Sequence, residues 1–245
     1  MSESSLPGGF VNQVVRVGTT VRRPSSGRAS FVHELLRLFE QRAWTGAPRF
    51  LGFDEEGREI LDYVDGRVAW TPDLRREACS DEALVRVAQL VREFHDLTSG
   101  SALVGPHEVV CHNDLSPKNT VYAVGEDGWR PVAFIDWDLA APGERIHDVA
   151  HVCWQYLDLG PSVMDPLEAG RQVRLICDAY GLADAHGIAD AILWWQDRCW
   201  RGIEAAATRG EPAMVRLRDE GVTEAVRAAY HWVSAHREDL AGRVR

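Results

Sequence analysis

Residues Val109–Asn119 read VVCHNDLSPKN, and the interpretation of the whole chain begins there. The apolar run VVC is typical of a buried strand. Three polar residues follow it with the spacing H-x-D-x-x-x-x-N, namely His112, Asp114 and Asn119. A second β-prone run, TVY, comes directly after Asn119. We therefore predict a polar loop that is held by a strand on each side.

A second group of acids lies a short distance downstream. Val132–Asp138 reads VAFIDWD, and the turn-like sequence GEDG at Gly125–Gly128 precedes it. An apolar run thus ends in the pair Asp136 and Asp138. The predicted order is strand, polar loop, strand, turn, strand and acidic pair.

These residue types suit phosphoryl transfer from a nucleotide, which needs an aimed acceptor hydroxyl and a metal ion on the phosphates. A carboxylate can orient the hydroxyl and take its proton, and we assign that role to Asp114. Carboxylate and amide oxygens are suitable ligands for Mg²⁺, and we assign them to Asn119 and Asp136. His112 is expected to be a structural hydrogen-bonding residue. The alternative is that Asp114 and Asn119 are ordinary loop residues, because both types favour loops.

Together, the HNDLSPKN and IDWD segments resemble the family of aminoglycoside phosphotransferases and choline kinase-like small-molecule kinases. Protein kinases share the fold, but their second motif is normally Asp-Phe-Gly, whereas this chain has Asp136-Trp137-Asp138. The resemblance implies an α+β, protein kinase-like fold of two lobes. A small antiparallel sheet with one helix, residues 1–65, would bind nucleotide. Residues 66–245 would form a larger helical lobe for catalysis and acceptor binding.

The predicted N-terminal lobe departs from the family in one respect. Kinases place a lysine on the third strand, where it holds phosphates and pairs with a glutamate of the following helix. No lysine occurs here, and Arg22 or Arg23 stands in its place. Neighbouring residues of a strand face opposite sides, so only one arginine can face the nucleotide. We expect Arg22, paired with Glu34 of a helix over Ser30–Gln41; both arginines could instead be solvated.

Two further segments match the nucleotide-binding parts of the family. Gly8, Gly9 and Asn12 fit its Gly-Gly-x-x-Asn loop, although a glycine pair before a strand is often only a turn. The backbone at Tyr63 and Val64 lies at the expected hinge between the lobes and would read the edge of the nucleotide base. The resemblance therefore implies Mg²⁺ and ATP as cofactors.

Local patterns predict several other elements. Ser80 or Asp81 can cap a helix whose apolar residues recur at helical spacing and which ends near Thr98. Gly181 is expected to end a later helix. Runs of β-prone residues indicate strands in the N-terminal part at 14–17, 20–22, 49–53 and 59–63.

The composition restricts the function classes. A net charge of −10 argues against a nucleic-acid partner, and no apolar run in the sequence approaches the length of a membrane span. The N-terminus lacks a signal-peptide pattern, so we expect a cytoplasmic protein. Five scattered cysteines without a C-x-x-C pair indicate neither a zinc site nor a disulfide framework. The oligomeric state is not decided by the sequence.

The chain after residue 166 is expected to consist of helices, several of which carry tryptophan. These aromatic side chains could form a wall for a cationic or sugar-like acceptor. Apolar spacing favours the simpler interpretation that most of them pack in the helical core.

Three functions remain open on the sequence. The first is an ATP- or GTP-dependent kinase that phosphorylates a hydroxyl of a small molecule, such as an aminoglycoside or amino alcohol. The second is a nucleotide-binding pseudokinase or scaffold, because the lysine is absent. The third is a protein kinase, against which the short stretch between Asp138 and Asp148 argues, since it leaves little room for an activation segment.

Overall fold

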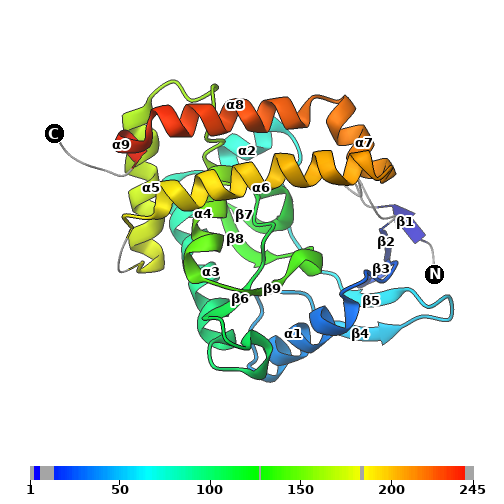
Figure 1. Ribbon diagram of the computed structural model, residues 1–245. Helices are drawn as coiled ribbons and strands as arrows, with labels where there is room; N and C mark the ends of the chain where they lie inside the picture. Colours follow the sequence, from blue (N-terminus) through cyan, green and yellow to red (C-terminus); the bar gives the residue numbers. More distant parts are fainter. Residues whose placement is uncertain (1–2, 6–13, 127, 183–184, 241–245) are drawn as a thin grey trace. The chain divides into compact units, whose positions relative to one another are not determined.

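The structure is a computed structural model that describes residues 3–5, 14–126, 128–182 and 185–240 (Figure 1). Two compact units make up the chain, Met1–Arg145 and Ile146–Arg245. The N-terminal sheet ends at Asp62, close to the predicted lobe boundary at residue 65, but the first compact unit continues beyond it. This unit contains both sequence motifs.

An antiparallel sheet opens the first unit, with the order β1-β2-β3-β5-β4 among the described residues. Its strands are β1 (Glu3–Ser5), β2 (Val15–Val17), β3 (Thr20–Arg23), β4 (Phe50–Phe53) and β5 (Glu59–Asp62). The four strands predicted for this part of the chain are confirmed. Strand β3 pairs directly with β5, which places Arg23 opposite Glu59 and Arg22 opposite Ile60. This register decides which arginine reaches the functional site.

Helix α1 (Ala29–Gln41) follows strand β3 and confirms the helix predicted over Ser30–Gln41. Its buried residues recur at helical spacing, so one face of the helix is apolar and the opposite face is polar. They are Val32, His33, Leu35, Leu36 and Phe39. His33 is the one polar side chain on this buried face, and it therefore needs a partner.

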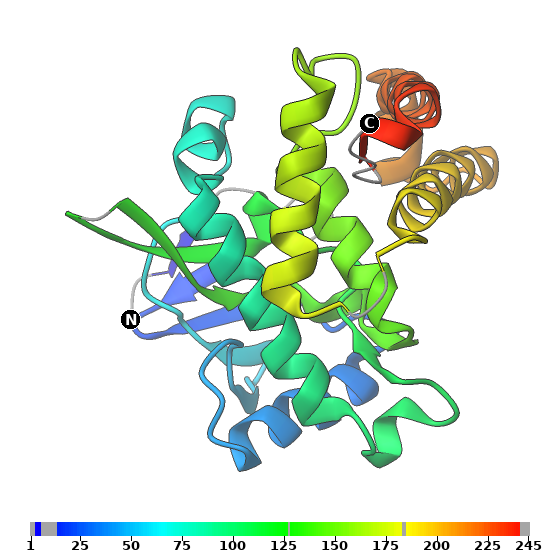
Figure 2. The same cartoon turned by 90° about the vertical axis from the view of Figure 1, so that its left-hand side faces the viewer.

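Helix α3 (Asp81–Thr98) carries the centre of the aromatic core. The Ser80 hydroxyl accepts a hydrogen bond from the Ala83 amide at 3.3 Å. This contact confirms the predicted N-cap. Phe94 is fully buried, and its ring lies 5.2 Å from that of Trp137 and 6.1 Å from that of Phe134. Such edge-to-face pairs contribute roughly 0.5–1.5 kcal/mol each beyond burial. A shorter helix, α2 (Pro72–Ala78), precedes α3 (Figure 2).

The motif region has the predicted order of strand, loop, strand, turn and strand. Strand β6 pairs with β9, and β7 forms a hairpin with β8. The strands are β6 (Val109–Cys111), β7 (Thr120–Gly125), β8 (Gly128–Phe134) and β9 (Ala141–Gly143). A 3₁₀ turn, η1 (Ala102–Val104), precedes β6. Two more lie between strands: η2 (Pro117–Asn119) between β6 and β7, and η3 (Trp137–Leu139) between β8 and β9.

Helices dominate the second unit, as expected. They are α4 (Arg145–Tyr156, beginning at the boundary), α5 (Pro166–Tyr180), α6 (Ile188–Thr208), α7 (Pro212–Asp219), α8 (Val222–Ala235) and α9 (Arg237–Leu240). Helix α6 packs along α8 (Figure 1).

Gly181 ends α5 with a φ of 76°. This left-handed residue confirms the predicted C-cap. Among the described helices, none has the length and apolar character needed to cross a bilayer.

The tryptophans of the second unit differ in burial. Trp154 and Trp195 are buried, and the Trp195 indole donates to the His147 carbonyl at 2.7 Å. The core interpretation is therefore confirmed for these two. Trp194 is 44% exposed and stacks on the His147 ring at 4.7 Å, so it belongs to the surface.

Replacing Phe94 by alanine is expected to lower the free energy of unfolding by about 3–5 kcal/mol, because it removes the centre of the aromatic core. Urea unfolding measures the change. The matched control is Val124→Ala, because Val124 lies on the exposed edge of the hairpin. The control should change the free energy by no more than about 0.5 kcal/mol. A loss below about 1 kcal/mol at Phe94 would contradict the central role of this ring.

Candidate active site

The loop after β6 is braced by the buried ring of His112. The Asp114 amide donates to His112 Nδ1 at 3.2 Å, and His112 Nε2 lies 3.1 Å from the Ile135 carbonyl oxygen. Since Nδ1 accepts, Nε2 carries the proton and donates to Ile135. His112 thus connects the loop to the strand that leads to Asp136. This is the structural hydrogen-bonding position expected for it.

Asp114 and Asn119 lie in direct contact. The amide nitrogen of Asn119 donates to the Asp114 carboxylate and to the Asp114 carbonyl, each at 2.8 Å. Asn119 is buried, whereas Asp114 is partly exposed. With its nitrogen used to hold the loop, Asn119 has its side-chain oxygen left as a neutral acceptor, a ligand type that Mg²⁺ accepts.

Asp136 is held in an uncommon backbone conformation at the end of β8. Its φ of 64° lies in the left-handed region. This conformation costs a residue other than glycine roughly 1–3 kcal/mol. The Ile135 amide donates to the Asn119 carbonyl at 2.9 Å, and the Trp137 indole donates to the Phe134 carbonyl at 3.0 Å. Trp137 is buried, and so the core holds this turn while the Asp136 side chain stays 51% exposed.

One arginine bridges the sheet and the acidic pair. Arg23 is 8% exposed, and its Nε donates to Glu59 at 2.8 Å. Its terminal nitrogens lie 2.6 Å from Asp138 Oδ1 and 3.5 Å from Asp136 Oδ1. Burial lowers the pKa of Arg23, but the carboxylates of Asp138, Glu59 and Asp136 outweigh this, and the net pKa lies above its usual value. Arg23 is therefore a permanent cation at this site.

Hydrogen bonds place Asp136 beside the loop, because the Ile135 amide donates to the Asn119 carbonyl and Asn119 holds the Asp114 carboxylate. Loss of hydration raises the pKa of the Asp136 carboxyl, and the negative charges of Asp138 and Asp114 raise it further. Arg23 acts in the opposite direction without cancelling the rise in the pKa. Asp114, Asn119 and Asp136, which the sequence analysis selected, are thus brought together in the first unit.

Two of the predicted residues lie elsewhere. Arg22 donates to the Thr20 hydroxyl at 2.7 Å and approaches Asp54 at 3.7 Å, so it faces away from the acidic pair. Arg23, and not Arg22 as expected, contacts the acidic pair, and the pairing of β3 with β5 places it opposite Glu59. Besides the acidic pair, Arg23 binds Glu59 of the sheet, not Glu34 of α1 as expected.

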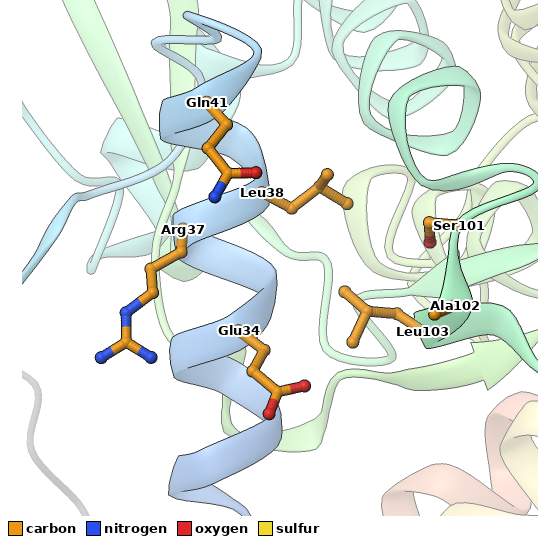
Figure 3. Close-up of a pocket in the computed structure, with 7 residues that line it drawn as sticks. All are labelled: Glu34, Arg37, Leu38, Gln41, Ser101, Ala102 and Leu103. Carbon is orange, nitrogen blue, oxygen red and sulfur yellow. The ribbon is translucent and has the colours of Figure 1, made fainter.

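Glu34 is exposed on the polar face of α1. There it lines a pocket of about 310 Å³ between α1 and the segment around η1 (Figure 3). The other lining residues are Arg37, Leu38, Gln41, Ser101, Ala102 and Leu103. None of them belongs to the acidic pair or the loop after β6, so this pocket is separate from the candidate active site.

The proposed hinge lies directly after β5. The Tyr63 amide donates to the Thr19 carbonyl at 2.9 Å, so it is not available to a nucleotide base. The guanidinium of Arg16 lies 3.6 Å from the centre of the Tyr63 ring. Base reading would fall to the remaining backbone groups of Tyr63 and Val64. Gly8, Gly9 and Asn12 lie outside the described residues.

The donor set fits a hard divalent cation. Asp114, Asp136 and Asp138 contribute carboxylates and Asn119 contributes an amide, all of them oxygen donors. Arg23 pairs with Asp136 and Asp138, but it also pairs with a fourth carboxylate, that of Glu59. Its one positive charge therefore does not neutralise the acids, and the site keeps an excess of negative charge. An ion such as Mg²⁺ would balance that excess.

The comparisons with known proteins agree with this geometry. The model of the phosphotransferase enzyme family matches residues 100–187, a range that includes both motifs. The trifolitoxin immunity protein of Rhizobium leguminosarum bv. trifolii is 30% identical over 233 residues, covering 84% of this chain and 86% of that protein.

Solved structures establish the fold. The GDP complex of aminoglycoside 2′-phosphotransferase-IIIa matches with a TM-score of 0.62 and 15% identity, covering 94% of this chain and 93% of that one. Ethanolamine kinase from Plasmodium vivax matches with a TM-score of 0.65 and 13% identity, covering 97% of this chain and 83% of that one. The fold is therefore that of the protein kinase-like phosphotransferases, as the sequence predicted. The chain belongs to the phosphotransferase enzyme family.

The variant Asp136→Asn is expected to stabilise the metal-free protein near neutral pH. Folding raises the pKa of Asp136, so ionisation of this carboxyl opposes folding, and a neutral amide removes that cost. The gain should be present above the folded pKa. It should disappear as the pH falls toward the ordinary aspartate value of about 3.9.

Urea unfolding in the presence of a chelator, at about pH 7 and about pH 4, measures this difference. Asp65→Asn is the control, because that side chain is 92% exposed and should give no pH-dependent gain. If Asp136→Asn is the less stable protein at neutral pH, the direction of the shift is wrong.

Proposed function

We propose that the chain transfers the γ-phosphate of ATP or GTP to a hydroxyl group of a small molecule. The observation that supports this is the meeting of Asp114, Asn119 and Asp136 in one acidic site beside Arg23. Membership in the phosphotransferase enzyme family agrees with it.

Asp114 would act as the base. Its carboxylate is held by Asn119, so it can accept the proton of the acceptor hydroxyl as that oxygen bonds to phosphorus. The bond to the nucleoside diphosphate breaks in the same step, and no phosphorylated enzyme is required. Asn119 and Asp136 would hold Mg²⁺, and Asp138 could share it. A bound Mg²⁺ would neutralise charge on the phosphates.

Arg23 would take the part that a lysine plays in kinases. Its guanidinium is always charged and offers donors in a planar fork that matches phosphate oxygens. The anchoring bond to Glu59 uses Nε and leaves the two terminal nitrogens directed to the side of Asp136 and Asp138. The missing lysine is thus compatible with an active enzyme.

Replacing Asp114 by alanine should lower turnover by roughly 10²–10⁴, the range for losing a general base, with nucleotide affinity nearly unchanged. Nucleotide consumption over a panel of aminoglycosides, amino alcohols and sugars measures turnover, and calorimetry measures affinity. Asp73→Ala, an exposed acid of α2, is the matched control. Full turnover by the Asp114 variant would rule out the assigned role, and nucleotide binding without turnover on any acceptor would favour a scaffold.

A second candidate function follows from the relative with 30% identity, which is described as a toxin immunity protein. This chain would then protect a cell against a toxin by phosphorylating a hydroxyl group of the toxin. The same Asp114, Asn119 and Asp136 would carry the transfer, and only the acceptor would differ.

Protection can be measured by expressing the wild-type chain in a trifolitoxin-sensitive strain and recording growth in the toxin. Enzymatic protection should be lost with Asp114→Ala and kept with Asp73→Ala. Equal protection by the Asp114 variant would mean that the chain acts by binding. No protection by the wild-type chain would exclude this toxin as its acceptor.

A further inference from the structure

Glu59 is a charged side chain at the centre of the first unit. It is 1% exposed, and each carboxylate oxygen has one partner. Oε2 accepts from Arg23 Nε at 2.8 Å, and Oε1 lies 2.9 Å from His33 Nε2. A buried carboxylate is tolerated only when its lone pairs are satisfied, so these two contacts account for its position.

His33 is itself held in place by aromatic packing. Its ring stacks on Phe50 at 3.6 Å with an interplanar angle of 15°, and it meets Phe53 edge-on at 5.5 Å. The ring therefore has little freedom to turn, and Nε2 stays directed at Glu59. Helix α1 is linked to the sheet by this contact.

The three side chains form a row that ends at the acidic pair. Arg23 lies opposite Glu59 in the pairing of β3 with β5, so the carboxylate reaches Nε from the adjacent strand. Because Nε is held there, the two terminal nitrogens are directed at Asp136 and Asp138. Among the described residues, Glu59 is the partner that holds the guanidinium from the side opposite the acidic pair.

We propose that Glu59 and His33 are the positioning residues for Arg23, in place of the helix glutamate that the family pattern led us to expect. His33 orients Glu59, and Glu59 orients the guanidinium toward the phosphates of a bound nucleotide. This inference rests on the proposed function, because it assigns Arg23 to a nucleotide. Glu34, the neighbour of His33, has no part in it, since it lies on the exposed face of α1.

The first test compares nucleotide affinity in three variants of the full chain. Calorimetry with ATP or GTP and Mg²⁺ should show binding weakened about tenfold or more for Glu59→Gln, because a charge-assisted bond to Arg23 is lost. Glu34→Gln should bind like wild type, whereas a helix glutamate of the usual kind would give the reverse result. Glu40→Gln, an exposed acid of the same helix, is the matched control.

A second pair of variants keeps the test usable if Glu59→Gln does not fold. His33→Phe retains an aromatic ring against Phe50 but cannot donate to Glu59, and it should weaken nucleotide binding several-fold. His33→Gln keeps an N–H donor and should recover most of the affinity. A purely structural role would lower the melting temperature of both variants without separating their affinities.

The outcomes separate the two proposals. If wild-type protein binds neither ATP nor GTP in the presence of Mg²⁺, the proposed function fails. If wild type binds nucleotide but Glu59→Gln and His33→Phe bind equally well, only the positioning role is overturned.

Discussion

The buried guanidinium of Arg23 connects the N-terminal sheet to the acidic pair of the second motif. Taking a charged side chain out of water is unfavourable unless it is paired, and here three carboxylates surround it. The ion pairs therefore constrain where β3, β5 and the turn at Asp136 lie within the first unit. The same contacts keep two acids close together that would otherwise repel each other.

The hydrophobic core supplies the rigidity that this arrangement needs. Trp137 stands between the two acids in sequence and is buried among Phe39, Phe94 and His112, so the turn cannot relax without opening the core. The left-handed backbone conformation at Asp136 is locally unfavourable, and the packing of Trp137 compensates for it. Hydrogen bonds through His112 and Asn119 then tie the loop after β6 to the same strand.

Departures from the family pattern lie in the sheet rather than in the motifs. In the proposed active site Arg23 would take the part of the lysine, and its partner Glu59 comes from a strand instead of the helix. The helix contributes an imidazole, His33, next to the glutamate that was expected.

The sequence alone determined the features that depend on near neighbours in the chain. Apolar periodicity predicted α1 and α3 with their boundaries, and the two motifs with their flanking strands selected Asp114, Asn119 and Asp136 as candidate site residues. Strand alternation showed that only one of Arg22 and Arg23 could face the site, but not which. That choice depends on the register of β3 against β5. The role of Glu59 depends on its buried contact with Arg23, which lies 36 positions earlier in the chain. Both are set by tertiary packing, because a strand carries no local signal of the partner that it will face.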